Sequence, residues 1–189
     1  MPDIFHVWRP TQEVIDAARL AAATSPFSYE PVGGTRQDLP VGFEHDVQSV
    51  IVGRGDLAFA RARLALLAGR AFDIPWVSLD RARFDVRPGA PLVHVSEQLC
   101  LFTVNACRII YVVDEPGDCA FAWGTLAGHP VCGEERLGLC LSDNGDVVFE
   151  IRKFSRPAHV FVRLAGPVAR RIQRRFTQDA FSALLAALR

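Results

Sequence analysis

The stretch that decides the fold is the C-terminal run of residues 154–189, FSRPAHVFVRLAGPVARRIQRRFTQDAFSALLAALR. Apolar side chains recur along it every three or four residues, which is the spacing of one face of an α-helix. Ser155 is placed to cap such a helix and Pro157 suits its first turn, whereas Pro167 should kink or restart it. A helix from Pro167 to Leu188 is roughly 33 Å long. It needs a broad apolar surface, so the sequence predicts a helix lying across a sheet.

The two faces of this helix differ in chemistry. The apolar residues that we expect to be largely buried are Leu164, Val168, Ile172 and Phe176. The opposite face carries a row of arginines: Arg163, Arg170, Arg171, Arg174 and Arg175. Such a row suits an anionic membrane surface, but aromatic residues that would stack on single-stranded nucleic acid are not interleaved with it. We therefore expect a solvated face, no nucleic-acid partner, and peripheral membrane contact as an open alternative.

The composition is that of a globular protein. The chain has 189 residues, half of them hydrophobic, and its 21 basic residues balance 21 acidic ones, so no global charge draws it to nucleic acid. We expect a single domain over residues 1–189. No apolar run is long enough for a membrane span, and the N-terminus lacks the pattern of a signal peptide. Five cysteines without a C-x-x-C pair favour a reducing compartment, so we predict a cytoplasmic protein that needs no cofactor.

Two further helices are expected in the first half of the chain. Thr11 would cap the first, whose inward residues are Val14, Ile15, Ala18, Ala21 and Ala22. A loop rich in turn residues follows at Phe27–Thr35, and then a strand at His45–Val52. Asp56 would cap the second helix, Gly69 would end it, and its inward residues would be Leu57, Ala60, Leu64 and Leu67.

The second half changes to short β-rich runs separated by turns. Asn144-Gly145 is a strong hairpin signal, because a type I′ turn needs positive φ at both central positions. Successive strands without intervening helices form an antiparallel meander. The fold class is therefore α+β, with a curved antiparallel sheet packed against the long C-terminal helix. Such a sheet encloses either a filled core or a pocket.

Several motifs resemble one protein family. They are Phe27–Thr35 (FSYxxVGGT), Val52–Gly55 (VGxG), Tyr111–Glu115 (YVVDE), Gly124–Glu135 (GTLAGHPxxGEE), Phe154–His159 (FSRPAH), Leu164–Pro167 (LAGP) and Gln173. Together they resemble the domain of unknown function nineteen-ninety family of bacterial and plant proteins, from about Phe27 to Leu185. The departures are Leu137-Gly-Leu139, where the family usually has an aromatic residue, and Leu67-Ala-Gly69, where it often has a tryptophan.

The family carries no established activity, but its order of elements is similar to the helix-grip fold. Proteins of that fold, such as lipid-transfer and plant-allergen-like proteins, hold hydrophobic ligands between the sheet and the last helix. The resemblance therefore implies a helix-grip-like architecture. Fold alone does not fix function.

The chemistry-bearing residues gather in Gly124–Glu135. His129 would act as a general base, oriented by Glu134 or Glu135, which point to opposite faces if this segment is a strand. The simpler alternative is that His129 bonds a loop carbonyl and the glutamates pair with arginines. His159 is expected to face the same region. His129, Cys132 and Glu134 have metal-ligand chemistry, but the second close pair of a structural zinc site is missing, so we predict no metal.

Three functions remain open at this point. The first is a binding module for a small hydrophobic or amphipathic molecule, lined by Phe102, Trp123, Thr125, Phe149 and Ser155. The second is an enzyme for hydrolysis, cyclisation or dehydration that uses His129 with Glu134 or Glu135, and His159. The third is a scaffold whose arginine face meets a membrane or a protein. The identity of the ligand and the oligomeric state lie beyond what these patterns indicate.

Overall fold

The structure, a computed structural model, describes residues 5–158, 164 and 166–189. In this part of the chain, eight strands form one antiparallel sheet. Seven of them follow the order β2-β8-β7-β6-β5-β4-β3, and β1 pairs with the N-terminal end of β5. The strands are β1 (Phe5–His6), β2 (Glu44–Arg54), β3 (Val77–Leu79), β4 (Pro91–Gln98), β5 (Leu101–Glu115), β6 (Asp118–Thr125), β7 (Val131–Leu141) and β8 (Asp146–Pro157). The α-helices are α1 (Gln12–Thr24), α2 (Gly55–Leu67) and α4 (Gly166–Ala187).

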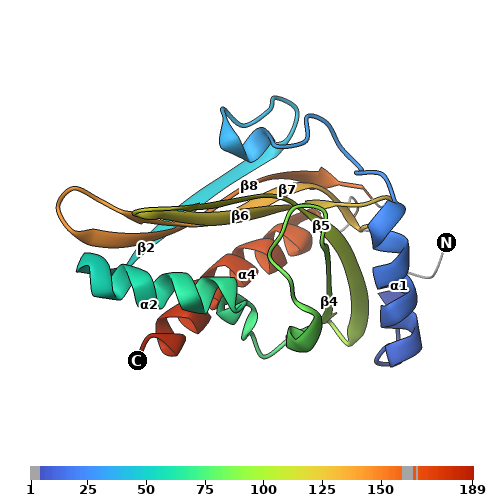
Figure 1. Cartoon of the computed structure of the whole chain (residues 1–189). Coiled ribbons are helices and arrows are strands. Elements are labelled where there is room, and N and C mark those ends of the chain that lie inside the picture. The colour runs from blue at the N-terminus through green and yellow to red at the C-terminus, as the bar shows by residue number, and fades with distance from the viewer. Residues whose placement is uncertain (1–4, 159–163, 165) are drawn as a thin grey trace.

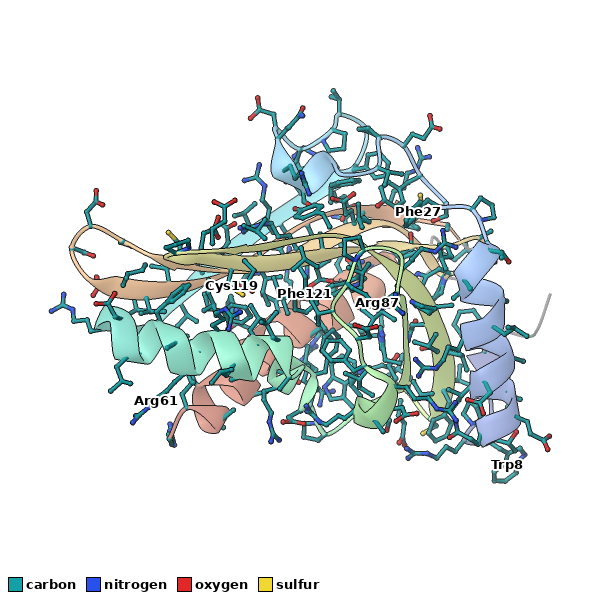
Figure 2. All side chains as sticks on the ribbon, in the orientation of Figure 1. Trp8, Phe27, Arg61, Arg87, Cys119 and Phe121 are labelled. Atoms are coloured by element: carbon teal, nitrogen blue, oxygen red, sulfur yellow. The ribbon has the colours of Figure 1, made fainter. Side chains whose placement is uncertain are left out.

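The sheet is curved and has different cover on its two faces (Figure 1). Helices α2 and α4 lie against the inner face, the loop between α1 and β2 lies against the outer face, and α1 packs near one end. Phe121 projects from β6 into the layer between the sheet and the helices, whereas Trp8 points away from the molecule near α1 (Figure 2). The predicted α+β fold, a curved antiparallel sheet closed by the C-terminal helix in helix-grip fashion, is confirmed.

Side chains that alternate between the two faces of the strands form the main core. On β8, Phe149 and Ile151 face α4 and are buried, whereas Phe154 faces the opposite side and packs against Tyr29 and Phe43. From α4 the core receives four buried side chains: Ala180, Phe181, Ala183 and Leu184. Because strand side chains alternate with a period of two, each strand feeds the helix layer on one face and the loop layer on the other.

Two turns differ from what the sequence indicates. Asn144-Gly145 does lie in the β7–β8 hairpin, but only Gly145 has a positive φ, so the turn is not type I′. Ser142 and Gly145 instead close a wider turn through a backbone hydrogen bond. The β4–β5 turn is formed by Leu99 and Cys100, both at positive φ. Neither residue is a usual choice for that conformation, so the sequence carries no signal for this turn.

The boundary between the last strand and the last helix was predicted wrongly. Ser155 does not cap a helix and Pro157 does not lie in a first turn, because β8 continues through both residues. Ser155 pairs with Gly133 and Pro157 with Val131, so backbone pairing to β7 extends the strand past the point where helical periodicity begins. Helix α4 begins at Gly166, close to the predicted restart at Pro167.

The depth of burial along α4 also differs from the prediction. Leu164 is 77% exposed and Val168 is exposed as well, while Ile172 and Phe176 are half-buried. The buried main-core residues of α4 begin at Ala180, Ile172 and Phe176 line a cavity, and Leu164 and Val168 belong to neither set. Arg170, Arg171, Arg174 and Arg175 are exposed, as expected of a solvated face, and Arg163 lies outside the described residues.

Helix α2 ends at Leu67, and Gly69, which has a positive φ, follows its C-cap Ala68, but the helix presents a different face from the predicted one. Its buried residues are Phe59, Ala62, Ala65 and Leu66, whereas Leu57 and Leu64 are about two-thirds exposed and Ala60 is also exposed. Apolar residues occur all round this helix, so periodicity did not distinguish its faces. Asp56 lies in the first turn without a side-chain capping bond, and the N-cap is Arg54.

Helix α1 is closer to its prediction, with Ala18 and Ala22 buried and Ile15 packed beside them. Its N-cap is Thr11, although the Thr11 side chain makes no capping hydrogen bond, and Ala21 is exposed. Three cysteines, Cys107, Cys119 and Cys132, are buried, and all five are free thiols. None of the described helices combines the length and the apolar character that crossing a membrane requires.

Candidate functional site

A cavity of about 170 Å³ lies between the inner face of the sheet and the first half of α4. Its apolar lining comes from the rings and alkyl groups of Trp76, Trp123, Ile172 and Phe176. Its polar lining comes mainly from His94, Asn105, Thr125, His129, Glu135 and Ser155. The cavity thus lies between the sheet and the last helix, and it combines flat apolar walls with hydrogen-bonding groups.

Glu135 is the acidic group of the cavity. In the sheet it is paired with Trp123 on β6 and with Lys153 on β8, and alternation directs all three side chains to the inner face. Its Oε1 is buried and has no hydrogen-bond partner among the described residues. Burial away from water raises the pKa of its carboxyl group, while the charge of Lys153 acts in the opposite direction.

Lys153 has only 9% of its side chain exposed. Its Nζ donates to Thr177 Oγ1 at 2.6 Å and to the carbonyl of Gln173 at 3.2 Å, and it lies 3.4 Å from Asp46 Oδ2. Two hydrogen bonds and one ion pair therefore join Lys153 on β8 to α4 and β2, and Asp46 already offsets its charge.

His129 borders the cavity from the β6–β7 connection. Its Nδ1 lies 2.7 Å from the carbonyl oxygen of Val131 and 3.1 Å from the Val131 amide nitrogen, so it donates to the carbonyl in one neutral tautomer and accepts from the amide in the other. Burial lowers the pKa of His129 to about 4, although the bond to Val131 opposes this effect, so the ring is neutral at pH 7.

His94 faces the same cavity from β4. Its Nδ1 is buried without a hydrogen-bond partner among the described residues. Burial, with a smaller contribution from His129, lowers the pKa of His94 to about 3. A neutral imidazole always carries one N–H, so His94 offers one unused donor and one unused acceptor to a molecule in the cavity.

Glu134, the second glutamate of the pair, has a structural role on the other face. Its Oε2 accepts from Tyr29 Oη at 2.8 Å and from the Gly33 amide at 2.7 Å. Its Oε1 accepts from the Thr35 amide at 2.9 Å and from the Thr35 hydroxyl. These four donors fasten the loop before β2 to the outer face. Glu134 borders the cavity, but its carboxylate is directed away from it, so a catalytic Glu134 is incompatible with this geometry.

The other predicted site residues divide into two groups. Trp123, Thr125 and Ser155 line the cavity. The Thr125 hydroxyl is already bonded to Ser28 and to the backbone of Gly133, and Ser155 accepts from Gln173 Nε2 at 3.2 Å. Phe102 and Phe149 are not among the lining residues: Phe102 pairs with β1, and Phe149 packs on Phe181 in the main core. His159 lies outside the described residues.

Gly133 shows how tightly this end of the cavity is built. A Cβ at this position would lie 2.1 Å from the carbonyl oxygen of Phe154 and 2.8 Å from the Cα of Ser155. Only glycine lets β7 and β8 approach this closely next to the Thr125 bonds. Gly133 of the Gly124–Glu135 motif is therefore needed for the backbone conformation next to His129 and Glu135.

Sequence reasoning missed His94, Lys153 and Trp76. A signal was present for Lys153, because alternation along β8 places it on the same face as Phe149 and Ile151. His94 likewise lies on the same face of β4 as the core residue Leu92, but a single histidine within an apolar strand does not indicate a cavity. Trp76 precedes a strand of three residues, and its indole donates to Asp179 on α4 at 2.7 Å.

Fold and cavity together define a helix-grip protein whose internal cavity is lined by a buried carboxyl group and two neutral imidazoles. Residues 28–183 match the family model described as domain of unknown function (DUF1990), so the chain belongs to this family. A UPF0548 protein of Deinococcus radiodurans is 36% identical over 137 residues, which cover 67% of this chain and 69% of the relative. A UPF0548 protein of Arabidopsis thaliana is 28% identical over 150 residues, covering 76% and 73%.

Solved structures support the fold at low sequence identity. A hypothetical protein of Helicobacter pylori has a TM-score of 0.56 at 10% identity, covering 88% of this chain and 99% of that one. The di-domain ARO/CYC protein StfQ of the steffimycin biosynthetic pathway has a TM-score of 0.51 at 8% identity, covering 77% of this chain and 50% of that one. At these identities the likeness is one of fold alone.

Proposed function

We propose that this protein binds a small amphipathic molecule in the cavity between the sheet and α4. The observation that carries the proposal is the pair of buried polar atoms without partners there, His94 Nδ1 and Glu135 Oε1. An unpaired buried polar group costs about 1–3 kcal/mol. A ligand that supplies both partners recovers that cost, and an empty site does not.

The volume limits the size of the ligand. A cavity of roughly 150 Å³ holds a molecule the size of benzene, whereas drug-sized ligands occupy roughly 300–1,000 Å³. At about 170 Å³ the present cavity suits one or two rings with a polar group. This proposal is narrower than lipid binding in general, because a whole acyl chain exceeds the space. The flat walls of Trp76, Trp123 and Phe176 favour a planar body.

The proposal is tested with a set of small aromatic and alicyclic fragments, observed by saturation-transfer NMR on the purified protein. Ile172→Trp places an indole in the cavity wall and should abolish the signals. Arg171→Trp is the matched control, because it adds the same group one residue earlier at an exposed position and should retain them. Equal binding by both variants, or no fragment binding to the parent protein, contradicts the proposal.

A further inference from the structure

The cavity contains the groups for proton transfer as well as for binding. Neither oxygen of Glu135 accepts a hydrogen bond within the described chain, and Oε1 is fully buried. Neither ring nitrogen of His94 has a hydrogen-bond partner there either, and His94 is a neutral donor beside the same cavity. A carboxylate in apolar surroundings is a stronger base than one in water, and a neutral imidazole polarises a carbonyl group.

From this arrangement we infer that Glu135 and His94 catalyse proton transfer at the carbon next to the carbonyl group of an uncharged, planar carbonyl compound. The inference rests on the proposed function, because the compound has to enter the cavity first. In this assignment Glu135 is the general base and His94 is the hydrogen-bond donor to the carbonyl oxygen. His129 belongs to the cavity wall, where its bond to Val131 fixes the β6–β7 connection.

Other reaction types fit the described residues less well. Nucleophilic catalysis needs a hydroxyl or thiol bonded to a base. Here the hydroxyl of Ser155 is bonded to Gln173, Ser96 is bonded to Thr103 and Asn105, and burial raises the pKa of the Cys107 thiol. Within the described part of the chain, the hydrogen bonds of the histidine rings go to the backbone and none goes to a hydroxyl or thiol group, so a proton shuttle is the chemistry that the cavity supports.

The charges around the base also select the substrate. Lys153 on β8, Asp46 on β2 and the Cys107 thiol on β5 are the titratable groups that act on Glu135. Lys153 lines the cavity but is already paired with Asp46 and hydrogen-bonded to Thr177 and Gln173, so a carboxylate or phosphate would have to compete with these contacts. An anion beside Glu135 would also be repelled. An uncharged carbonyl compound avoids both costs.

The step balances without a further reactant. The C–H bond next to the carbonyl group breaks and its proton moves to the Glu135 carboxylate. The electron pair forms a C=C bond, and the carbonyl π pair moves to oxygen, where the N–H of His94 stabilises the negative charge. If the Glu135 carboxyl group first exchanges its proton with solvent, return of a proton to the same carbon completes an isotope exchange. Return of a proton to a different carbon of the conjugated enolate completes an isomerisation.

The test uses 2-indanone, a small planar ketone, with the full-length protein in heavy water. Proton NMR follows the replacement of the hydrogens next to the carbonyl group by deuterium, while saturation transfer measures binding. The parent protein should accelerate exchange over buffer, and Glu135→Gln should reduce this acceleration by about a hundredfold or more while binding persists. His94→Leu should also lose acceleration, and His94→Gln, which keeps an N–H, should retain part of it. Glu150→Gln is the matched control, since Glu150 lies on the outer face of β8 and should behave as the parent.

The outcomes separate the two proposals. Bound 2-indanone without accelerated exchange, or equal rates for the parent and Glu135→Gln, overturns the inference and leaves the binding proposal intact. Binding of other fragments but not of the ketone also overturns it, because the ligand class would be wrong. Failure of all fragments to bind overturns the proposed function itself.

Discussion

The two neighbouring glutamates should differ in how much stability they lose on the same isosteric change. Glu134→Gln replaces one carboxylate oxygen by an NH₂ group that cannot accept a hydrogen bond. Each oxygen currently serves one backbone amide, Gly33 or Thr35, so one of these fixed N–H groups is left facing a donor in either orientation of the amide. One unpaired buried donor costs about 1–3 kcal/mol, and the bonds to the remaining oxygen lose their charge assistance. We expect a loss of about 2–4 kcal/mol in the free energy of unfolding.

Glu135→Gln is the matched comparison, because it makes the same change one residue later on the inner face. No hydrogen bond to a described residue is lost, and Lys153, the cross-strand neighbour of Glu135, keeps its ion pair with Asp46, so the free energy of unfolding should change by less than about 1 kcal/mol.

Urea denaturation measures both variants, with an unchanged m-value as the sign that the unfolded state is the same. For a chain of this length the Glu134→Gln loss corresponds to a fall in Tm of roughly 4–16 °C. Equal effects of the two substitutions, or a larger loss for Glu135→Gln, would refute the assignment of Glu134 to loop anchoring and of Glu135 to the cavity.

Three further predictions concern the histidines, α4 and its arginines. In the folded protein the pKa values of His94 and His129 are lowered to about 3 and about 4, below the unfolded value near 6.5. The unfolded chain therefore binds more protons below pH 6.5, and each histidine lowers the free energy of unfolding by up to about 1.4 kcal/mol per unit of falling pH. His94→Gln should therefore lose stability less steeply than the parent between pH 6.5 and 4 in urea titrations, and parallel curves would contradict this. Phe181→Ala should lower the free energy of unfolding by about 3–5 kcal/mol because Phe181 is buried against Phe149. Leu164→Ala, at an exposed position, should change it by less than about 0.5 kcal/mol. A larger fall in Tm for Leu164→Ala than for Phe181→Ala would contradict the described packing. Reversing Arg170, Arg171 and Arg174 to glutamate should change stability by less than about 1 kcal/mol, since these side chains are exposed, and a cooperative melt close to that of the parent checks it.

Much of the fold could be predicted from patterns that the chain repeats. Successive alternating runs predicted the meander, and the Asn-Gly pair located the β7–β8 hairpin. The errors arose where tertiary pairing overrides local signals. Ser155 has the sequence context of a helix cap, yet pairing with Gly133 keeps it in β8. Leu57 and Leu64 have the spacing of a buried face, yet α2 turns Phe59 and Leu66 to the sheet instead.

The candidate site could be predicted in part. The motif around His129 and Glu135 pointed to the correct region, and alternation already required Glu134 and Glu135 to point to opposite faces. Which of the two faces the cavity depends on the register of β7, and that register is fixed by partners such as Trp123 and Lys153. His94 joins the site from a strand 35 residues earlier than His129, and only the curvature of the sheet brings them to the same cavity.

The indole N–H resonances of the three tryptophans test the central claim most directly. Trp76 and Trp123 line the cavity, and Trp8 is 83% exposed near α1, so the protein contains its own control. In ¹H–¹⁵N spectra titrated with each compound of the fragment set, 2-indanone included, we expect the Trp76 and Trp123 signals to move together and saturate with at least one compound while the Trp8 signal stays in place. Shifts confined to Trp8, or no shift of any of the three signals with any compound, would contradict a ligand-binding cavity between the sheet and α4.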